Sequence, residues 1–215
     1  MSKKILWVVG TLQQIGGGER LLLEGVKYYD SIGIKTKVVT WNFNKEALFR
    51  EGYKLDDLEV VGNGNVIKRS DIFSFTFNRF KSILELLKIA RKFNPEILIC
   101  QSEYDAIIVG IIAKILNKKF IVLIFGQTYQ FSNDNIKYSR LYKKHLEEIV
   151  NSCQGYKDII PLKGPKLGII DSIVNNSLAY LRYYFIRKAH KTFTLSKQVK
   201  WEVEKIYKIK SKVLR

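Results

Sequence analysis

The sequence predicts an α/β protein with a Rossmann-like parallel sheet and helices on both faces. Three observations predict it: short apolar runs of strand length recur along the chain, helical segments separate them, and a glycine-rich turn follows the first run. Strands that alternate with helices form βαβ units, whose strands run parallel. The ligands of such sheets bind at the carboxyl ends of the strands.

Each element follows from its own pattern. The apolar or alternating segments predicted as strands are residues 4–10, 34–41, 58–61, 97–100, 119–125, 192–195 and 212–214. The first helix carries Leu22, Val26 and Tyr29, and amphipathic or apolar helices are expected at residues 77–90, 103–116, 136–150, 170–185 and 199–206. Pro95 ends the helix predicted at residues 77–90, because proline lacks the N–H that continues a helix. Ser196 is placed to cap the helix predicted at residues 199–206.

Length and composition favour one domain in a reducing compartment. Of the 215 residues, 47% are apolar, which is enough for a substantial core. We expect residues 1–215 to form a single domain with a basic, less regular excursion at about residues 135–190. Two cysteines are too few for a disulfide framework, and no signal peptide precedes the first strand. The most apolar helix, residues 106–116, is shorter than the roughly 20 residues of a membrane span.

Positive charge is concentrated in the last third of the chain. Residues 1–134 hold 19 Lys and Arg against 14 Asp and Glu, a net charge of +5, whereas residues 135–215 hold 18 against 6, a net charge of +12. This asymmetry points to a polyanionic partner, either an anionic membrane surface or nucleic acid. The alternative is a solvated, lysine-rich surface. No groove-reading or single-strand-binding motif is recognisable, so nucleic acid is not the expected partner.

A turn of three glycines precedes the first helix, at Gly16, Gly17 and Gly18. Glycines let a backbone pass close to a ligand, and the helix behind them adds a partial positive charge at its amino end. We therefore predict that the turn, with Glu19 and Arg20, receives a phosphate or another anion. The alternative is a tight turn in which Glu19 complements the helix dipole and Arg20 pairs with a nearby carboxylate.

Polar segments follow two other predicted strands and are expected at the same edge of the sheet. They contribute Gln101, Ser102, Glu103 and Tyr104 after one strand, and Gly126, Gln127 and Tyr129 after the next. The alternative for the first segment is helix capping, because Ser102 is followed three residues later by Asp105. Both roles are compatible.

A basic stretch interleaved with aromatic residues is a candidate membrane contact, formed by Lys163, Lys166, Arg182, Tyr183, Arg187 and Lys188. The alternative is a core helix, since the apolar stripe from Ile170 to Phe185 also suits packing on a sheet. His145 and His190 lie among lysines and are expected to be solvated. Because neither has cysteines or carboxylates at metal-ligand spacing, no metal site is expected.

Three segments, in this order, resemble the acceptor-side half of GT-B glycosyltransferases, in particular the family-4 type. Residues 15–23 resemble the Gly-Gly-x-Glu-Arg opening of that family's first helix. Residues 94–102 resemble its Pro-Asp-(apolar)-His-x-His/Ser strand, and residues 189–197 its Ala-Asp-x-(apolar)-x-(apolar)-Ser segment. Together these segments extend over nearly the whole chain.

The resemblance implies transfer of a hexose, with retention of configuration, from a nucleotide-sugar to a lipid-linked or polysaccharide acceptor. The nucleotide-sugar would be a substrate, and no tightly bound cofactor is expected. In such enzymes the turn equivalent to residues 16–20 faces the donor diphosphate across the cleft. The segments that begin at Gln101 and Gly126 would shape the acceptor cleft. The expected location is the cytosolic face of a membrane.

Two features depart from the family pattern. Phe125-Gly126 stands where relatives commonly have His-Gly, so no catalytic residue is assigned. The sequence ends at Arg215, shortly after the strand that in relatives leads into a donor-binding half. We therefore expect this chain to need a donor-binding domain or partner chain and to be inactive alone. The alternative is a non-catalytic membrane-surface module or one subunit of a split transferase.

Overall fold

The computed structural model describes residues 3–50, 52, 58–62, 77, 80–126, 135–152, 161–164 and 166–214. Within these ranges, seven parallel strands form one sheet in the order β3-β2-β1-β4-β5-β6-β7. The strands are β1 (Lys4–Val9), β2 (Lys35–Thr40), β3 (Leu58–Val60), β4 (Ile97–Cys100), β5 (Lys119–Ile124), β6 (Lys191–Thr194) and β7 (Lys212–Val213). The predicted fold class is confirmed.

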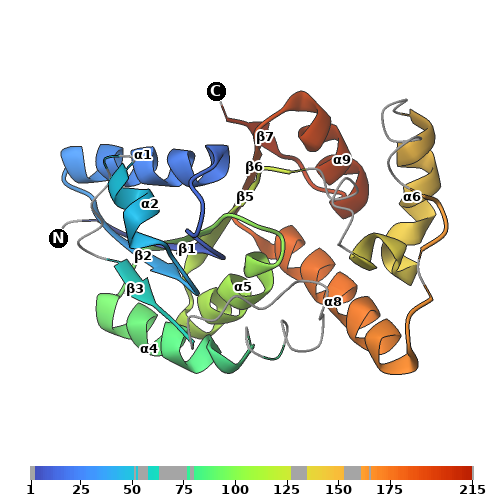
Figure 1. The fold of residues 1–215 in the computed structure, drawn as a ribbon, viewed down its shortest axis with the longest axis horizontal. Helices are drawn as coiled ribbons and strands as arrows, with labels where there is room; N and C mark the ends of the chain where they lie inside the picture. Colours follow the sequence, from blue (N-terminus) through green and yellow to red (C-terminus); the bar gives the residue numbers. More distant parts are fainter. Residues whose placement is uncertain are drawn as a thin grey trace.

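Helices cover both faces of the sheet (Figure 1). They are α1 (Gly17–Ser31), α2 (Lys45–Arg50), α4 (Ile83–Phe93), α5 (Asp105–Leu116), α6 (Arg140–Ser152), α8 (Ile169–Lys188) and α9 (Lys197–Tyr207), with a 3₁₀ turn, η1 (Asn135–Tyr138). Alternation along β1 divides the core: Ile5 and Trp7 pack towards α1, whereas Leu6 and Val8 join the larger cluster with α4, α5 and α8. Both faces are therefore buried, as in other parallel sheets.

Local chemistry sets several helix ends. Asn94 adopts a left-handed conformation (φ 50°) after α4, directly before Pro95. Asn117 does the same (φ 51°) between α5 and β5. At the start of α9 the Ser196 Oγ accepts a hydrogen bond from the Val199 N–H at 3.1 Å, so the predicted N-cap is confirmed.

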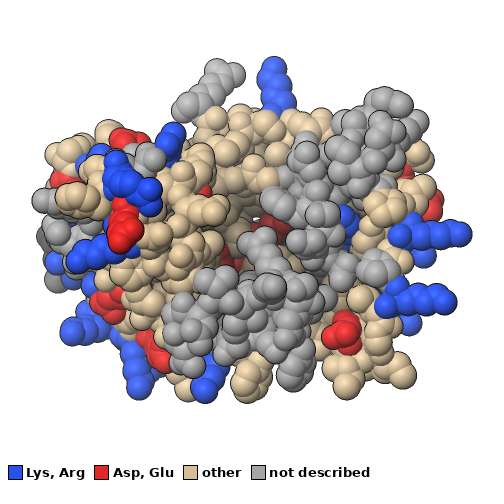
Figure 2. Space-filling model, viewed as in Figure 1, with Lys and Arg blue, Asp and Glu red and all other residues tan. Residues whose placement is uncertain are grey.

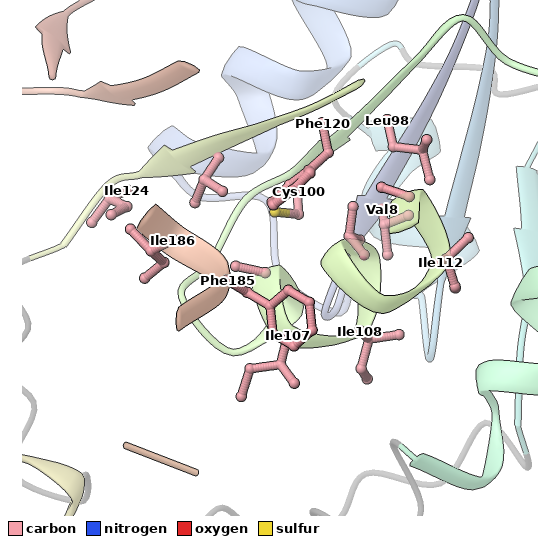
Figure 3. Close-up of a cluster of buried hydrophobic side chains, with 14 of the residues drawn as sticks. Val8, Leu98, Cys100, Ile107, Ile108, Ile112, Phe120, Ile124, Phe185 and Ile186 are labelled. Carbon is pink, nitrogen blue, oxygen red and sulfur yellow. The ribbon is translucent and has the colours of Figure 1, made fainter. Parts of the chain in front are cut away.

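The larger core cluster lies between the sheet, α5 and α8 (Figure 3). Phe185 of α8 packs directly on the backbone of Gly110 in α5. A Cβ placed on Gly110 would lie 2.3 Å from the Phe185 Cδ1, so no side chain fits there without displacing the ring. The same cluster takes in Tyr142 and Leu146 from α6, which fixes that helix beside α8 and α9.

Candidate functional site

The carboxyl edge of the sheet is built from loops that bind one another. After β1, the Leu12 N–H donates to the Asn42 carbonyl at 2.9 Å, and the Asn44 N–H donates back to the Leu12 carbonyl at 3.1 Å. These bonds tie the loop after β1 to the loop after β2. The path of the chain into the glycine turn is thereby fixed.

The glycine turn forms the amino end of α1, which begins at Gly17. Gly16 is extended, and its N–H donates to the Glu19 carboxylate at 3.0 Å. Glu19 therefore uses the Gly16 N–H, as in one half of a capping box. The N–H groups of Gly17 and Gly18 belong to the first turn, where the helical hydrogen-bond ladder has no acceptor for them.

Gly18 joins α1 to the ends of β4 and β5. The side-chain amide of Gln101 donates to the Gly18 carbonyl at 2.8 Å. The ring of Phe125 lies against Gly18 so closely that a Cβ there would be 2.8 Å from its Cδ2. The structure therefore brings Gly18, Gln101 and Phe125 together, with Gly126 next to Phe125. Gln127 and Tyr129 lie outside the described residues.

Alanine at Gly17 and alanine at Gly18 should have opposite effects on stability. A Cβ at Gly17 meets nothing within 4 Å, so Gly17→Ala should raise the free energy of unfolding by up to about 1 kcal/mol, since alanine favours helix. Gly18→Ala must displace the Phe125 ring and should lower it by about 1–2 kcal/mol. Urea unfolding measures both. A gain in stability at both positions would contradict the close packing of Phe125.

Ser102 pairs with Asp105, the first residue of α5. Its Oγ accepts from the Asp105 N–H at 3.0 Å and donates to the Asp105 carboxylate at 2.7 Å. The pairing of Ser102 with Asp105 that the capping interpretation predicted is formed, although the N-cap residue of α5 itself is Tyr104. Whether Ser102 also contacts an acceptor stays a prediction.

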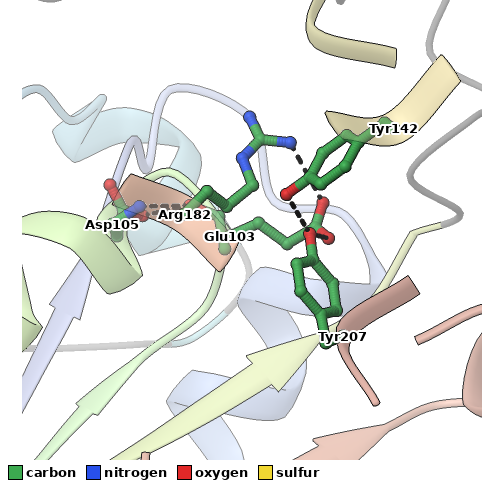
Figure 4. Close-up of polar contacts among 6 residues, drawn as sticks. Glu103, Asp105, Tyr142, Arg182 and Tyr207 are labelled. Carbon is green, nitrogen blue, oxygen red and sulfur yellow. Dashed lines mark hydrogen bonds and ion pairs between the residues drawn. The ribbon is translucent and has the colours of Figure 1, made fainter. Parts of the chain in front are cut away.

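Glu103 points into the interior, into a cluster of polar side chains from α6, α8 and α9 (Figure 4). The Tyr142 hydroxyl donates to that of Tyr207 at 3.0 Å, and the Tyr207 hydroxyl donates to the Glu103 carboxylate. An Arg182 Nη1 lies 3.5 Å from Glu103, and its guanidinium carbon lies 4.1 Å from the centre of the Tyr104 ring. Glu103 and Tyr104, predicted for the acceptor cleft, are thus held by interior contacts.

This cluster gives stability a dependence on alkaline pH. Burial, together with the Glu103 carboxylate, raises the pKa of Tyr207 well above its ordinary value of about 10. A raised folded-state pKa stabilises the protein below the unfolded-state pKa, and that contribution is lost as pH rises above about 10. Stability should therefore fall above that pH by at most about 1.4 kcal/mol per pH unit from this group. Chemical denaturation at several pH values, with Tyr207→Phe as the comparison, measures it. Equal slopes for the two proteins would contradict it.

The structure removes Arg182 from the predicted membrane patch. Its side chain is 0% exposed and packs against Glu103 and the Tyr104 ring. The remaining patch residues are not gathered either: Lys163 and Lys166 precede α8, whereas Arg187 and Lys188 end it, about 30 Å away along 20 residues. Arg187 donates to the Tyr183 hydroxyl, and Lys188 lies over the Tyr184 ring. On the face shown in Figure 2, Lys and Arg are spread around the rim.

Within the described ranges, no helix has the length and apolar character needed to cross a bilayer. In the same ranges, no three His, Cys, Asp or Glu side chains lie close enough together to bind a metal ion.

Comparison of the fold with solved structures gives consistent matches. The chain superposes on the lipopolysaccharide outer core galactosyltransferase WaaB with a TM-score of 0.53 at 11% identity, covering 94% of this chain and 42% of WaaB. For Anabaena Alr3699/HepE in complex with UDP-glucose the TM-score is 0.56 at 11% identity, covering 97% and 43%. A UDP-N-acetylglucosamine 2-epimerase matches with a TM-score of 0.51 at 10% identity, covering 95% and 45%.

The chain has the fold of the N-terminal half of a GT-B protein. It spans less than half the length of these three proteins. No protein-family model and no curated protein sequence matches it. At 10–11% identity the likeness establishes the fold alone, and the epimerase among the matches shows that this fold serves more than one reaction.

The sequence did not predict the partners of Glu103. Tyr142 and Tyr207 read as core aromatics on amphipathic helices, and they are separated from Glu103 by 39 and 104 residues. The one local signal was Glu103 itself, an acidic residue between a buried strand and an apolar helix. Only the parallel topology places α6, α8 and α9 around it.

Proposed function

We propose that this chain is the acceptor-binding half of a glycosyltransferase that uses a nucleotide-sugar donor. The observation that carries the proposal is the convergence of Gly18, Gln101 and Phe125 at the carboxyl edge of a GT-B-type half. WaaB is a galactosyltransferase, and HepE was solved with UDP-glucose, which supports sugar transfer from a nucleotide-sugar. Hexose transfer to a lipid-linked or polysaccharide acceptor, at the cytosolic side of a membrane, is the form we propose.

In this proposal the amino end of α1 neutralises the donor diphosphate. The Gly17 and Gly18 N–H groups and the helix dipole offer partial positive charge where the leaving diphosphate gains negative charge. No proton transfer is needed from the turn. The Gln101 amide fixes the Gly18 carbonyl, and the Phe125 ring packs against Gly18. The acceptor would enter beside Gln101, Ser102 and Gly126.

Activity should require a donor-binding half. The purified chain alone is expected to release no UDP from UDP-sugars above background, because it would hold few of the donor contacts. Joined to a donor-binding half, supplied from the same gene or a separate one, it should release UDP when an acceptor extract is added. Turnover by the isolated chain at ordinary enzyme rates would refute the half-enzyme proposal.

A proline at Gly17 isolates the role of one N–H. Proline is well tolerated at the first position of a helix, and the extended Gly16 before it suits a following proline. Gly17→Pro removes the N–H, whereas Gly17→Ala keeps it and adds the same Cβ. In the joined enzyme, kcat/KM for the nucleotide-sugar should fall about tenfold or more for proline only. Equal activity of the two variants would exclude the Gly17 N–H from catalysis.

A second candidate function is contact with a membrane surface through α8. Its outer face exposes an apolar stripe at helical spacing, formed by Ile169, Ile173, Tyr180 and Tyr184. Lys166 precedes the stripe, and Arg187 and Lys188 follow it, a pattern typical of helices that lie in an anionic membrane interface. This arrangement supports peripheral attachment that keeps Lys166, Arg187 and Lys188 of the predicted patch, replaces the buried Arg182, and adds the exposed apolar stripe.

Vesicle flotation tests this contact. Ile169 is 81% exposed and Ile173 is 61% exposed, so aspartate at both positions should leave the fold intact. Binding to phosphatidylglycerol vesicles should drop about tenfold or more, because apolar area is lost and negative charge is added. Phe49→Asp on α2, which is 69% exposed, is the matched control and should bind as the wild type does. If all three proteins bind equally, α8 is not the contact.

A further inference from the structure

A hollow of about 420 Å³ lies at the opposite edge of the sheet from the glycine turn. It opens at the amino ends of β5 and β6, between the last turns of α5 and α8. The His190 N–H donates to the Phe120 carbonyl at 2.8 Å and closes the two strands there. The side chains with polar groups that line it are Lys114, Lys118, Lys119, Lys188, His190 and Tyr184.

The floor of this basic pocket is apolar. Two of its residues are small and leave the volume of the pocket open. Gly110 and Ala113 of α5 face it, with Phe120 from β5. The Phe185 ring lies against Gly110 in the core cluster (Figure 3) and also contributes to the lining of the pocket. A volume of this size lies within the range of small-molecule sites, which are mostly apolar with a few polar groups.

The rim of the basic pocket carries positive charge without compensation. Among the described residues, none of the four lysines forms an ion pair with a carboxylate, and no Asp or Glu lines the pocket. Lys114 and Lys188 lie in the last turns of helices, where a cation complements the dipole. That does not account for Lys118 and Lys119, which lie outside any helix. Lys118 is half-buried.

We propose that the basic pocket binds a phosphate monoester whose ester group is apolar. The phosphate carries close to two negative charges near neutral pH and accepts several hydrogen bonds, which suits ammonium groups on the rim. The ester group would lie on the floor, against Phe120, Ala113 and Tyr184. A soluble phosphorylated metabolite and the headgroup region of an acidic lipid share this chemistry. The site is separate from the carboxyl edge, so it does not depend on the proposed function.

Calorimetric titration of the chain with phenyl phosphate tests the pocket, with inorganic phosphate and phenol at matched ionic strength. Phenyl phosphate should bind about tenfold or more tightly than either, because only it can contact both the lysines of the rim and the apolar residues of the floor. The variant Lys118→Glu/Lys188→Glu should lower the affinity for phenyl phosphate by about tenfold or more. The control variant Lys143→Glu/Lys144→Glu on α6, with the same change of net charge, should leave that affinity unchanged. Lys118→Gln/Lys188→Gln repeats the test without charge reversal, and circular dichroism verifies folding.

Vesicles of phosphatidylcholine, with and without phosphatidic acid, identify the source of the ligand. If phenyl phosphate displaces the chain from phosphatidic acid vesicles, the pocket takes a lipid headgroup. If the chain binds phenyl phosphate but phenyl phosphate leaves vesicle binding unchanged, the ligand is soluble. Both results support the proposal. It is overturned if the substitutions at Lys118 and Lys188 leave phenyl phosphate binding unchanged, or if inorganic phosphate binds equally well.

Discussion

Arg182→Met should destabilise the protein by about 3–5 kcal/mol, the usual effect of removing one partner of a buried ion pair. Arg182 is 0% exposed and Glu103 11% exposed, so without the guanidinium the carboxylate keeps its charge in a poorly solvated place. The lost packing of the guanidinium on Tyr104 adds to the effect. Urea unfolding with linear extrapolation measures the loss.

Two further variants separate charge from packing. Glu103→Gln keeps an acceptor for the Tyr207 hydroxyl but removes the negative charge. It should lower stability in the wild type and recover part of it in the Arg182→Met background. Arg187→Met on the same helix removes an exposed cation that contacts Tyr183 and should cost less than about 1 kcal/mol. Additive effects of Glu103→Gln and Arg182→Met would contradict a coupled ion pair.

Gly110→Val should destabilise the protein by about 3 kcal/mol, at the upper end of overpacking effects. The Cβ alone would lie 2.3 Å from a buried aromatic ring, and the two additional methyl groups require α5 and α8 to separate. The helix gains little in return, because valine is only slightly better than glycine within a helix. Thermal and urea unfolding both measure the change.

A double-mutant cycle with Phe185→Leu tests whether the contact with the Phe185 ring causes the loss of stability. Leucine removes the ring atoms that meet Gly110, so Gly110→Val should be less harmful in that background by more than about 1 kcal/mol. Gly17→Ala, where a Cβ meets nothing within 4 Å, is the control for a glycine substitution without a clash. An unchanged effect of Gly110→Val in the Phe185→Leu background would show that the two residues do not press on each other.

Much of the fold was predictable because its signals are local. The run of residues 97–100 became β4 with the same bounds, and the expected Ser196 cap is formed. The helix α2 was not predicted, since six residues are too few to display a helical period. The start of α5 was expected at Glu103 and is observed two residues later, at Asp105, where Glu103 and Tyr104 form a turn before the helix.

The candidate site was predictable only at the level of strand ends. The rule for parallel sheets placed the glycine turn and Gln101 at one edge, and the Gln101–Gly18 hydrogen bond lies there. The direction of a side chain was not predictable. Arg182 reads as a surface cation beside aromatics, yet it is buried because Glu103, 79 residues away, lies opposite it. The basic pocket was missed for the same reason, since α5 and α8 meet only in the folded chain.

An NMR titration of the ¹⁵N-labelled chain with UDP tests most directly whether the turn before α1 receives a nucleotide diphosphate. The backbone amide signals of Gly17 and Gly18 should move in a saturable manner, together with the side-chain amide of Gln101, which bonds to Gly18. Glycine amides resonate in a separate region of the spectrum, so their shifts are readily followed. If these signals stay fixed while UDP binds elsewhere on the chain, the turn is not the diphosphate site.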